Sequence, residues 1–533
     1  MKKKFKKLSI VVFILLALLL VTSTYFVNNI YYYNSSRSII KYLIYAGIIF
    51  TGLLIVIFNI WGFKSIKKNK TKNYVWFIII ITLCMITQVF VSFNLNKIAN
   101  SIKKVTNTTN VHSSSLIVLK NSNIKDIKDV KNKKIGIISD ENNIDGYIIP
   151  NEIIEKEEIK EDNLVTYDTY IEMLEDLYDE EIDACFISSS YGNMFINTEG
   201  FEDLKTKVTE IYKKEKEIDK EMSNNKTLTE PFTILLMGVD GEKGEASFNG
   251  DSLMLITFNP NTMNATILSI PRDTLVPIAC YKNHARNKIN SAAYGGIDCM
   301  KKTIENYTGI DIDYWATVNF TGLIDLVDAL GGIKVDVPYA FCESSSERLF
   351  GEHTVYVEKG LQTLDGKKAL AFARNRHPWP QFCPKKYSKY NSNDFIRGQN
   401  QQQIVNAILN ELKNIRTLKE VYALLDVVGD NINTNIDKET MMTGFDTFKN
   451  LLLKSRNIDN EDFVGTQRLY LSGYDKYINK IYYYEAYKQS LKEVVDAMKI
   501  NLELKEPEMD KEFSFSINKP YVNKQIGKGI YKY

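Results

Sequence analysis

The chain has 533 residues, with 67 lysines and arginines against 65 aspartates and glutamates, and a formal net charge of +2 at pH 7. This small net charge is the sum over lysine-rich N-terminal segments and the much longer rest of the chain. The composition therefore gives no sign of a nucleic-acid partner.

Three apolar runs open the chain, at residues 8–27, 42–63 and 74–93. Each has roughly 20 residues, the length that a helix needs to cross a bilayer. The first run is too long for a secretory signal and lacks a clean cleavage motif, which favours an uncleaved helix. Lysines precede the first run and separate the second from the third, so the positive-inside rule places those segments in the cytoplasm. We therefore predict a three-helix anchor in the plasma membrane over residues 1–94, with the rest of the chain outside.

Four of the six cysteines lie beyond the first two hundred residues, where an extracellular position would permit disulfides. We expect the pairs 280–299 and 342–383, although the sequence leaves other connectivities open. No CxxC or histidine-rich spacing accompanies these cysteines, so they are not expected to bind a metal.

Residues 95–205 alternate strand-like and helix-like segments. Strands are expected at 116–119, 134–138, 164–167 and 184–187, with helices at 124–130, 148–157 and 170–178. This alternation predicts a small α/β domain with a parallel sheet. Residues 127–136 and 181–184 resemble one lobe of extracellular solute-binding proteins, but no cluster of charges converges there. We therefore favour a spacer or partner-docking module, followed by a solvated helix or linker at 206–230.

The main domain is expected over residues 231–505, followed by a C-terminal tail at 506–533. Its first strands are predicted at 232–239, 252–258 and 265–270, with helices at 291–307, 319–330 and 367–373. Charged residues flank these strands: Asp240 follows the first, Asp251 precedes the second, and Arg272–Asp273 follows the third. Strand ends are where α/β sheets commonly place their chemistry. The predicted fold class is α/β.

The charged residues of this domain predict a diphosphate site. Arginine forks match phosphate oxygens, and carboxylates tolerate phosphate when a divalent cation lies between them. A spacing of three and four residues places Asp394, Arg397 and Gln401 on one helix face. Taken singly, each of these residues is more commonly a surface ion pair or a cap. Taken together with Arg374 and Arg376, they favour a Mg²⁺–diphosphate site.

An ordered set of motifs resembles the LytR-CpsA-Psr family. The motifs are Gly238-x-Asp240, Asp251-Ser252, Ser269-Ile270-Pro271-Arg272-Asp273, Lys288-Ile289-Asn290-Ser291-Ala292, Gly331-Gly332-Ile333, Leu364-x-Gly366, Arg374-x-Arg376 and Asp394-x-x-Arg397-x-x-x-Gln401. They span residues 231–410, and the expected anchor and extra domain are similar to capsule-type members. The resemblance implies a mixed sheet flanked by helices and a phosphotransferase. It would move a glycan from undecaprenyl diphosphate to peptidoglycan through a phosphodiester.

The resemblance also implies roles for individual residues. Asp240 and Asp251 would hold Mg²⁺, with Mn²⁺ as a substitute, and Asp273 and Asp394 would orient arginines or take the acceptor proton. The substrate would be bound by Arg272, Lys288, Arg374, Arg376, Arg397 and Gln401. The chain departs from the family at Glu242, Asn249 and Gln399, where basic residues are common, and these changes thin the positive charge near the phosphates.

The expected partners are the lipid-linked glycan, peptidoglycan, the bilayer and other capsule or wall assembly proteins. Two alternatives stay open: a membrane-bound regulatory protein, and a carrier of lipid-linked glycan without transferase activity. The full set of Asp240, Asp251 and Arg272 favours catalysis, because a carrier does not need a metal at the phosphate.

Overall fold

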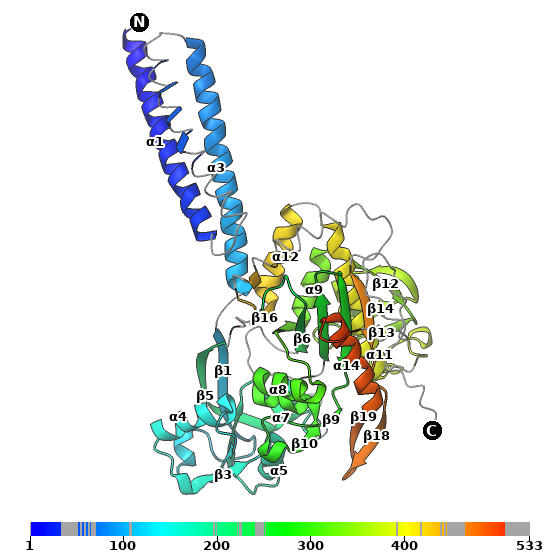
Figure 1. Cartoon of the computed structure of the whole chain (residues 1–533). Coiled ribbons are helices and arrows are strands. Elements are labelled where there is room, and N and C mark those ends of the chain that lie inside the picture. Colours follow the sequence, from blue (N-terminus) through cyan, green and yellow to red (C-terminus); the bar gives the residue numbers. More distant parts are fainter. Residues whose placement is uncertain are drawn as a thin grey trace. The chain divides into compact units, whose positions relative to one another are not determined.

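The structure is a computed structural model of the whole chain (Figure 1). It describes residues 2–33, 71–105, 109–195, 200–220, 226–239, 252–390, 393–415, 418–437 and 464–506, with a few single residues between these ranges. The chain divides into two compact units, Met1–Lys104 and Val105–Tyr533, which are described separately below.

The N-terminal unit contains two long helices, α1 (Lys2–Tyr33) and α3 (Thr71–Val105). They share polar contacts: Gln88 Nε2 donates to Ser23 Oγ at 3.1 Å, and Asn96 Nδ2 donates to Tyr25 Oη at 2.8 Å. Within the described ranges, no helix has the length and apolar character needed to cross a membrane. The prediction of three transmembrane helices is therefore wrong. Counting apolar runs overlooked the polar residues that these helices include, such as Gln88 and the buried Ser92.

The expected middle span at residues 42–63 lies mostly outside the described residues.

The second unit begins with a small α/β domain, here called the accessory domain. Its five-stranded sheet has the order β3-β2-β4-β1-β5. The strands are β1 (Thr109–Leu119), β2 (Ile135–Ile138), β3 (Leu164–Tyr167), β4 (Ala184–Ser188) and β5 (Val208–Asp219). Its helices are α4 (Ile149–Lys156), α5 (Tyr170–Tyr178), α6 (Tyr191–Met194) and α7 (Leu204–Lys207), and a π-helical turn, η2 (Ile144–Ile148), precedes α4.

The parallel core predicted for this domain is present, because β2 pairs in parallel with both β3 and β4. The long strand β1 pairs antiparallel with β4 and β5. Residues 208–219, expected as part of a helix or linker, form β5 instead. Charged side chains alternate along this edge strand, and Lys214 and Lys216 both reach Glu152 of α4. Such cross-strand and helix contacts stabilise a strand that hydropathy alone does not reveal.

The main domain is built on a six-stranded mixed sheet of order β16-β11-β6-β7-β8-β17. The strands are β6 (Phe232–Val239), β7 (Ser252–Asn259), β8 (Asn264–Ile270), β11 (Tyr314–Asn319), β16 (Ile432–Thr434) and β17 (Gly465–Leu469). The centre, β6-β7-β8, is antiparallel, whereas β11 and β17 run parallel to β6 and β8. The α/β fold class is confirmed for this domain.

Helices cover both faces of this sheet. They are α8 (Gly296–Thr308), α9 (Phe320–Ala329), α10 (Gly366–Arg374), α11 (Asp394–Glu411), α12 (Leu418–Asn431) and α14 (Lys488–Asn501). Strand residues alternate between the faces. Leu235 joins the core cluster that includes residues of α8 and α14, whereas Leu236 and its register partner Met254 line a cavity beside α9 and α11.

Short strands complete the domain: β9 (Leu275–Pro277), β10 (Arg286–Lys288), β12 (Ile333–Val337), β13 (Phe341–Glu343), β14 (Val355–Val357), β15 (Gly360–Leu364), β18 (Gly473–Ile478) and β19 (Ile481–Ala486). The short helix η5 (Ile289–Gly295) precedes α8. Both predicted disulfides are confirmed, Cys280–Cys299 with a Cα–Cα distance of 5.5 Å and Cys342–Cys383 with 6.5 Å.

Candidate functional site

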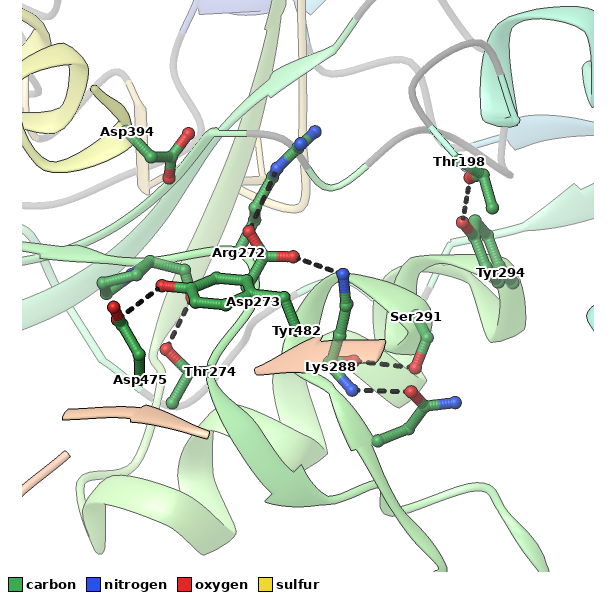
Figure 2. A network of polar contacts seen from close by, with 12 residues as sticks. Thr198, Arg272, Asp273, Thr274, Lys288, Ser291, Tyr294, Asp394, Asp475 and Tyr482 are labelled. Atoms are coloured by element: carbon green, nitrogen blue, oxygen red, sulfur yellow. Dashed lines mark hydrogen bonds and ion pairs between the residues drawn. The ribbon is translucent and has the colours of Figure 1, made fainter. Parts of the chain in front are cut away.

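Arg272 and Asp273, which follow β8, form a charged network with Lys288 of β10 (Figure 2). Asp273 Oδ1 lies 2.7 Å from Lys288 Nζ, and Asp273 Oδ2 lies 3.6 Å from Arg272 Nε. The Asp273 side chain is 15% exposed and that of Arg272 is 13% exposed, so solvent screens these charges less than on an open surface. The carboxylate thus holds two cationic side chains that were predicted to bind substrate.

The backbone of this network is fixed from several elements. Thr274 N and Oγ1 donate to the Pro271 carbonyl at 3.0 and 2.6 Å, which closes a tight turn. Asn290 N donates to the Arg272 carbonyl at 3.2 Å, and Tyr484 N of β19 donates to the Asp273 carbonyl at 2.8 Å. Because rigid neighbours already fix these groups in place, the groups lose little conformational entropy when they bind a charged ligand.

Tyr482 of β19 connects this network electrostatically with Asp394 at the start of α11. Its hydroxyl donates to Asp475 Oδ1 at 3.0 Å. Burial raises the pKa of Tyr482 above its usual value, and the negative charges of Asp475, Asp273 and Asp394 raise it further. Three carboxylates therefore act on one hydroxyl group, and Figure 2 shows the hydrogen bond from Tyr482 to Asp475.

Helix α11 carries the next predicted residues. Its N-cap is Asn393, whose Oδ1 accepts from Ile396 N at 3.0 Å, so the first turn is fixed. Arg397 Nη2 lies 2.6 Å from Asp394 Oδ1, and the Arg397 side chain is only 11% exposed. One turn further, Gln401 Oε1 accepts from Ser252 Oγ at 3.0 Å, and its Nε2 donates to the Ala373 carbonyl at 3.1 Å. The Gln401 amide therefore links β7 to α10 and keeps one N–H for a ligand.

Arg374 lies at the end of α10, and Arg376 follows it two residues later. Arg374 Nη1 donates to the Ser345 carbonyl at 2.8 Å, Nη2 donates to Ser344 Oγ at 3.2 Å, and the guanidinium carbon lies 4.9 Å from the centre of the Phe320 ring. Stacking on an aromatic face is a common way to orient an arginine fork.

Arg374 and Arg376 border an apolar cavity of about 390 Å³ on the α9–α11 face of the sheet. Ten leucine, isoleucine, valine and methionine side chains from β6, β7, α9 and α11 line it. Arg374, Arg376, Arg397, Gln401 and Arg348 also line it. Such a cavity suits a molecule with an apolar body and an anionic group, because guanidinium groups bind phosphate or carboxylate while the chain is buried.

A second, more polar hollow of about 350 Å³ adjoins the apolar cavity. The two share Ser252, Arg397 and Gln401 as lining residues. Asp394 and Asp475 line the polar hollow, together with the aromatic ring of Tyr484. The shared residues therefore stand between an apolar compartment and one that offers carboxylates.

Sequence reasoning missed a polar group at the rim, formed by Glu343, His377 and Trp379. Glu343 is 3% exposed, and its Oε2 accepts from Trp379 Nε1 at 3.2 Å. Burial and the charge of Arg376 lower the pKa of His377, while Glu343 opposes this effect. Among the described residues, His377 Nδ1 is buried without a hydrogen-bond partner. The sequence signal was the His-Pro-Trp run directly after Arg376.

The predicted metal ligands, Asp240 and Asp251, lie outside the described residues. In the ranges that the structure describes, no group of three or more histidine, cysteine, aspartate or glutamate side chains could hold a metal. Mg²⁺ and its two ligands thus stay predictions.

Taken together, the fold and the cavity define an α/β protein whose apolar cavity is bordered by cationic side chains. The model of the LytR_cpsA_psr family matches residues 196–500, and the chain belongs to this family. A second model, described as NMT1/THI5 like, matches residues 97–215, which include much of the accessory domain.

Named relatives cover about half of the chain. The polyisoprenyl-teichoic acid–peptidoglycan teichoic acid transferase TagU of Bacillus subtilis (strain 168) is 34% identical over 300 residues, covering 56% of this chain and 85% of the relative. The corresponding transferase TagV of the same strain is 32% identical over 285 residues, covering 51% of this chain and 65% of the relative. The crystal structure of B. subtilis TagV is 32% identical and covers 52% of this chain and 99% of that one, with a TM-score of 0.41.

Proposed function

We propose that this protein transfers a cell-wall glycopolymer from a polyprenyl diphosphate carrier to peptidoglycan. The observation that carries the proposal is the apolar cavity lined by Arg374, Arg376 and Arg397. A polyprenyl chain requires an apolar compartment, and a diphosphate requires several fixed positive charges. Family membership and the named transferases among the relatives support the same reaction.

The reaction is a phosphoryl transfer between two oxygens. A hydroxyl oxygen of peptidoglycan attacks the phosphorus that carries the glycan, and the bond from that phosphorus to the bridging oxygen breaks. Polyprenyl phosphate leaves with the bridging oxygen, and the hydroxyl proton passes to a carboxylate. Asp394, which lines the polar hollow, and Asp273, which is bound to Lys288, are the candidate proton acceptors.

The arginines stabilise charge on the phosphate oxygens as the leaving group departs. Fixed donors of this kind, in a site that excludes water, commonly account for much of the rate enhancement in phosphoryl transfer. Asp240 and Asp251 would hold Mg²⁺, or Mn²⁺ in its place, whose charge would ease the departure of the lipid phosphate.

The glycopolymer that we propose is a teichoic acid, because the named relatives transfer that class of polymer. A capsular polymer on the same diphosphate is the alternative. We place the reaction at the outer face of the plasma membrane, where the lipid carrier meets peptidoglycan. The two disulfides agree with an oxidising location.

The test is a transfer assay with the purified full chain, a short-chain polyprenyl diphosphate glycan, peptidoglycan and Mg²⁺. Release of polyprenyl phosphate and attachment of glycan are measured together. Arg376→Ala should lower kcat/KM by about a hundred-fold or more, as expected for a donor to developing charge. Arg286→Ala is the matched control, because Arg286 pairs with Glu485 and does not line either cavity.

Three results would contradict the proposal in different ways. Equal rates for Arg376→Ala and wild type would remove the arginines from the reaction. Tight binding of the donor without release would indicate a carrier. Neither binding nor release would favour a regulatory protein.

A further inference from the structure

A third cavity lies between the accessory domain and the main domain, and the proposed transferase reaction does not use it. Its volume is about 830 Å³, and it is here called the interdomain cleft. One wall comes from the accessory domain, with residues of β1, the loop after β2 and the end of β5. The other wall comes from residues 279–282 and 294–302 and from Trp315 of β11.

Direct contacts hold the two domains together around this cleft. The rings of Phe195 and Tyr294 have centroids 4.9 Å apart, and Thr198 Oγ1 lies 3.2 Å from the Tyr294 hydroxyl (Figure 2). Elsewhere, Asn433 Nδ2 of β16 donates to Asn110 Oδ1 of β1 at 3.1 Å, and Lys220 donates to Asn433 Oδ1. The cleft is therefore framed by direct contacts between the accessory domain and the main domain.

The cleft lies at the edge of the accessory sheet where open α/β folds bind ligands. Strand β3 lies on one side of β2 and β4 on the other, so the connection from β3 to β4 crosses over β2. Ligands of such sheets bind beyond the carboxyl ends of the parallel strands, at this reversal of strand order. Ser139–Asn143 follow β2 directly, Asp168 follows β3, and these residues line the cleft.

One buried side chain of the cleft has an unused donor. Asn143 is 8% exposed, and its Oδ1 accepts from Gly146 N at 2.7 Å and from Tyr170 Oη at 3.3 Å. The backbone N–H of Gly146 fixes which end of the amide is the oxygen. Among the described residues, Asn143 Nδ2 makes no hydrogen bond, and the atom is not sealed from solvent. An amide NH₂ that opens to the cleft can donate to a ligand oxygen there.

The excess of carboxylates in the cleft favours a cationic group on the ligand. Six carboxylates line it against three lysines, with His112 paired to Asp145 Oδ1 at 3.0 Å. The carboxylates belong to Asp140, Glu141, Asp145, Asp168, Asp219 and Asp298. The rings of Tyr281, Tyr294 and Trp315 also contribute to the wall, and aromatic faces attract cations. An anionic ligand would be repelled here.

We propose that the interdomain cleft binds a small ammonium compound that also carries an oxygen acceptor. Its ammonium group lies against Asp140 and Asp168, and its oxygen accepts from Asn143 Nδ2. Amino sugars and amino acids both have this chemistry. The assignment is independent of the transferase reaction, because none of the described residues that line the cleft also lines the apolar cavity or the polar hollow.

The test is isothermal titration calorimetry of the full chain with four probes. Glucosamine and lysine carry the ammonium group, whereas N-acetylglucosamine and diacetyl-lysine are their neutral counterparts. We expect saturable binding of one amine at millimolar concentration or below, and at least about ten-fold weaker binding of its acetylated form. Binding of glucosamine would identify the ligand as an amino sugar, and binding of lysine would identify it as an amino acid.

The variants are chosen to remove charge and keep hydrogen bonds. Asp140 Oδ1 accepts from Asn142 N, and Asp168 Oδ1 accepts from Ser139 Oγ. Asp140→Asn and Asp168→Asn keep these acceptors, so each should fold and weaken binding by about ten-fold. Asp162→Asn, at an exposed carboxylate outside the cleft, should leave binding unchanged.

A melting curve of each variant confirms that it folds. If Asp140→Asn does not fold, Asp168→Asn, at an exposed position, is a sufficient test by itself. Equal affinity for amines and acetylated probes would overturn the proposal. So would equal affinity of wild type and Asp168→Asn, or the absence of saturable binding by both amines.

Discussion

The position of Asp273 between two cations leads to a quantitative prediction for Asp273→Ala. The carboxylate lies 2.7 Å from Lys288 Nζ and 3.6 Å from Arg272 Nε. A charge-assisted hydrogen bond contributes about 1.5–3 kcal/mol, and about 1.4 kcal/mol corresponds to a ten-fold change in rate. The shorter contact dominates, so Asp273→Ala should lower kcat/KM by about ten- to a hundred-fold in the transfer assay.

A double-mutant cycle separates the two roles that Asp273 could have. If Asp273 acts by holding Lys288, then Asp273→Ala combined with Lys288→Met should lose about as much activity as the worse single variant. If the two losses multiply instead, the positioning argument is refuted, and Asp273 acts on the reaction itself. Melting temperatures of the three variants control for unfolding, because Asp273 is largely buried.

Three further predictions concern stability and the lipid. Ion pairing with Lys476 holds the pKa of Glu485 at about 2, below its usual value of 4.5, so its stabilisation is present above pH 4.5 and is lost as the pH falls towards 2. Glu485→Gln should therefore cost about 1–2 kcal/mol in urea unfolding at neutral pH, and a difference that persisted at pH 2 would contradict this assignment. Leu323→Trp, which fills the apolar cavity, should raise KM for long-chain donors more than for short-chain donors, and equal effects would argue against chain binding there. Cys342→Ser with Cys383→Ser opens a loop of 41 residues and should lower stability by about 2–4 kcal/mol, measured as a shift in the unfolding midpoint.

The sequence predicted the central strands and the charges at their ends, because apolar runs of strand length and the motifs are local signals. β6, β7 and β8 begin and end within one residue of the predicted positions. The charged edge strand β5 was not predicted, since its stability comes from pairing with β1 rather than from its own pattern. Likewise, Glu343 gave no signal, because tertiary packing brings its partner Trp379 to it from 36 residues away.

The candidate site was predicted only in part for the same reason. The helical spacing of Asp394 and Arg397 correctly implied their contact. By contrast, the spacing could not reveal that Gln401 is bound to Ser252 and to the carbonyl of Ala373. The apolar cavity depends on which sheet face α9 and α11 cover, and residue periodicity does not contain that information.

The order of strands in the main sheet has a consequence for synthesis. The edge strand β17 (Gly465–Leu469) pairs with β8 (Asn264–Ile270), which precedes it by about 200 residues. At roughly 5–20 residues per second, β8 waits for about 10–40 seconds before its partner emerges from the ribosome. During that interval its backbone edge is open to pairing with other chains. Binding proteins that cover nascent chains should therefore be needed most in this window, and a stop codon before β17 should produce aggregates rather than a weakened enzyme.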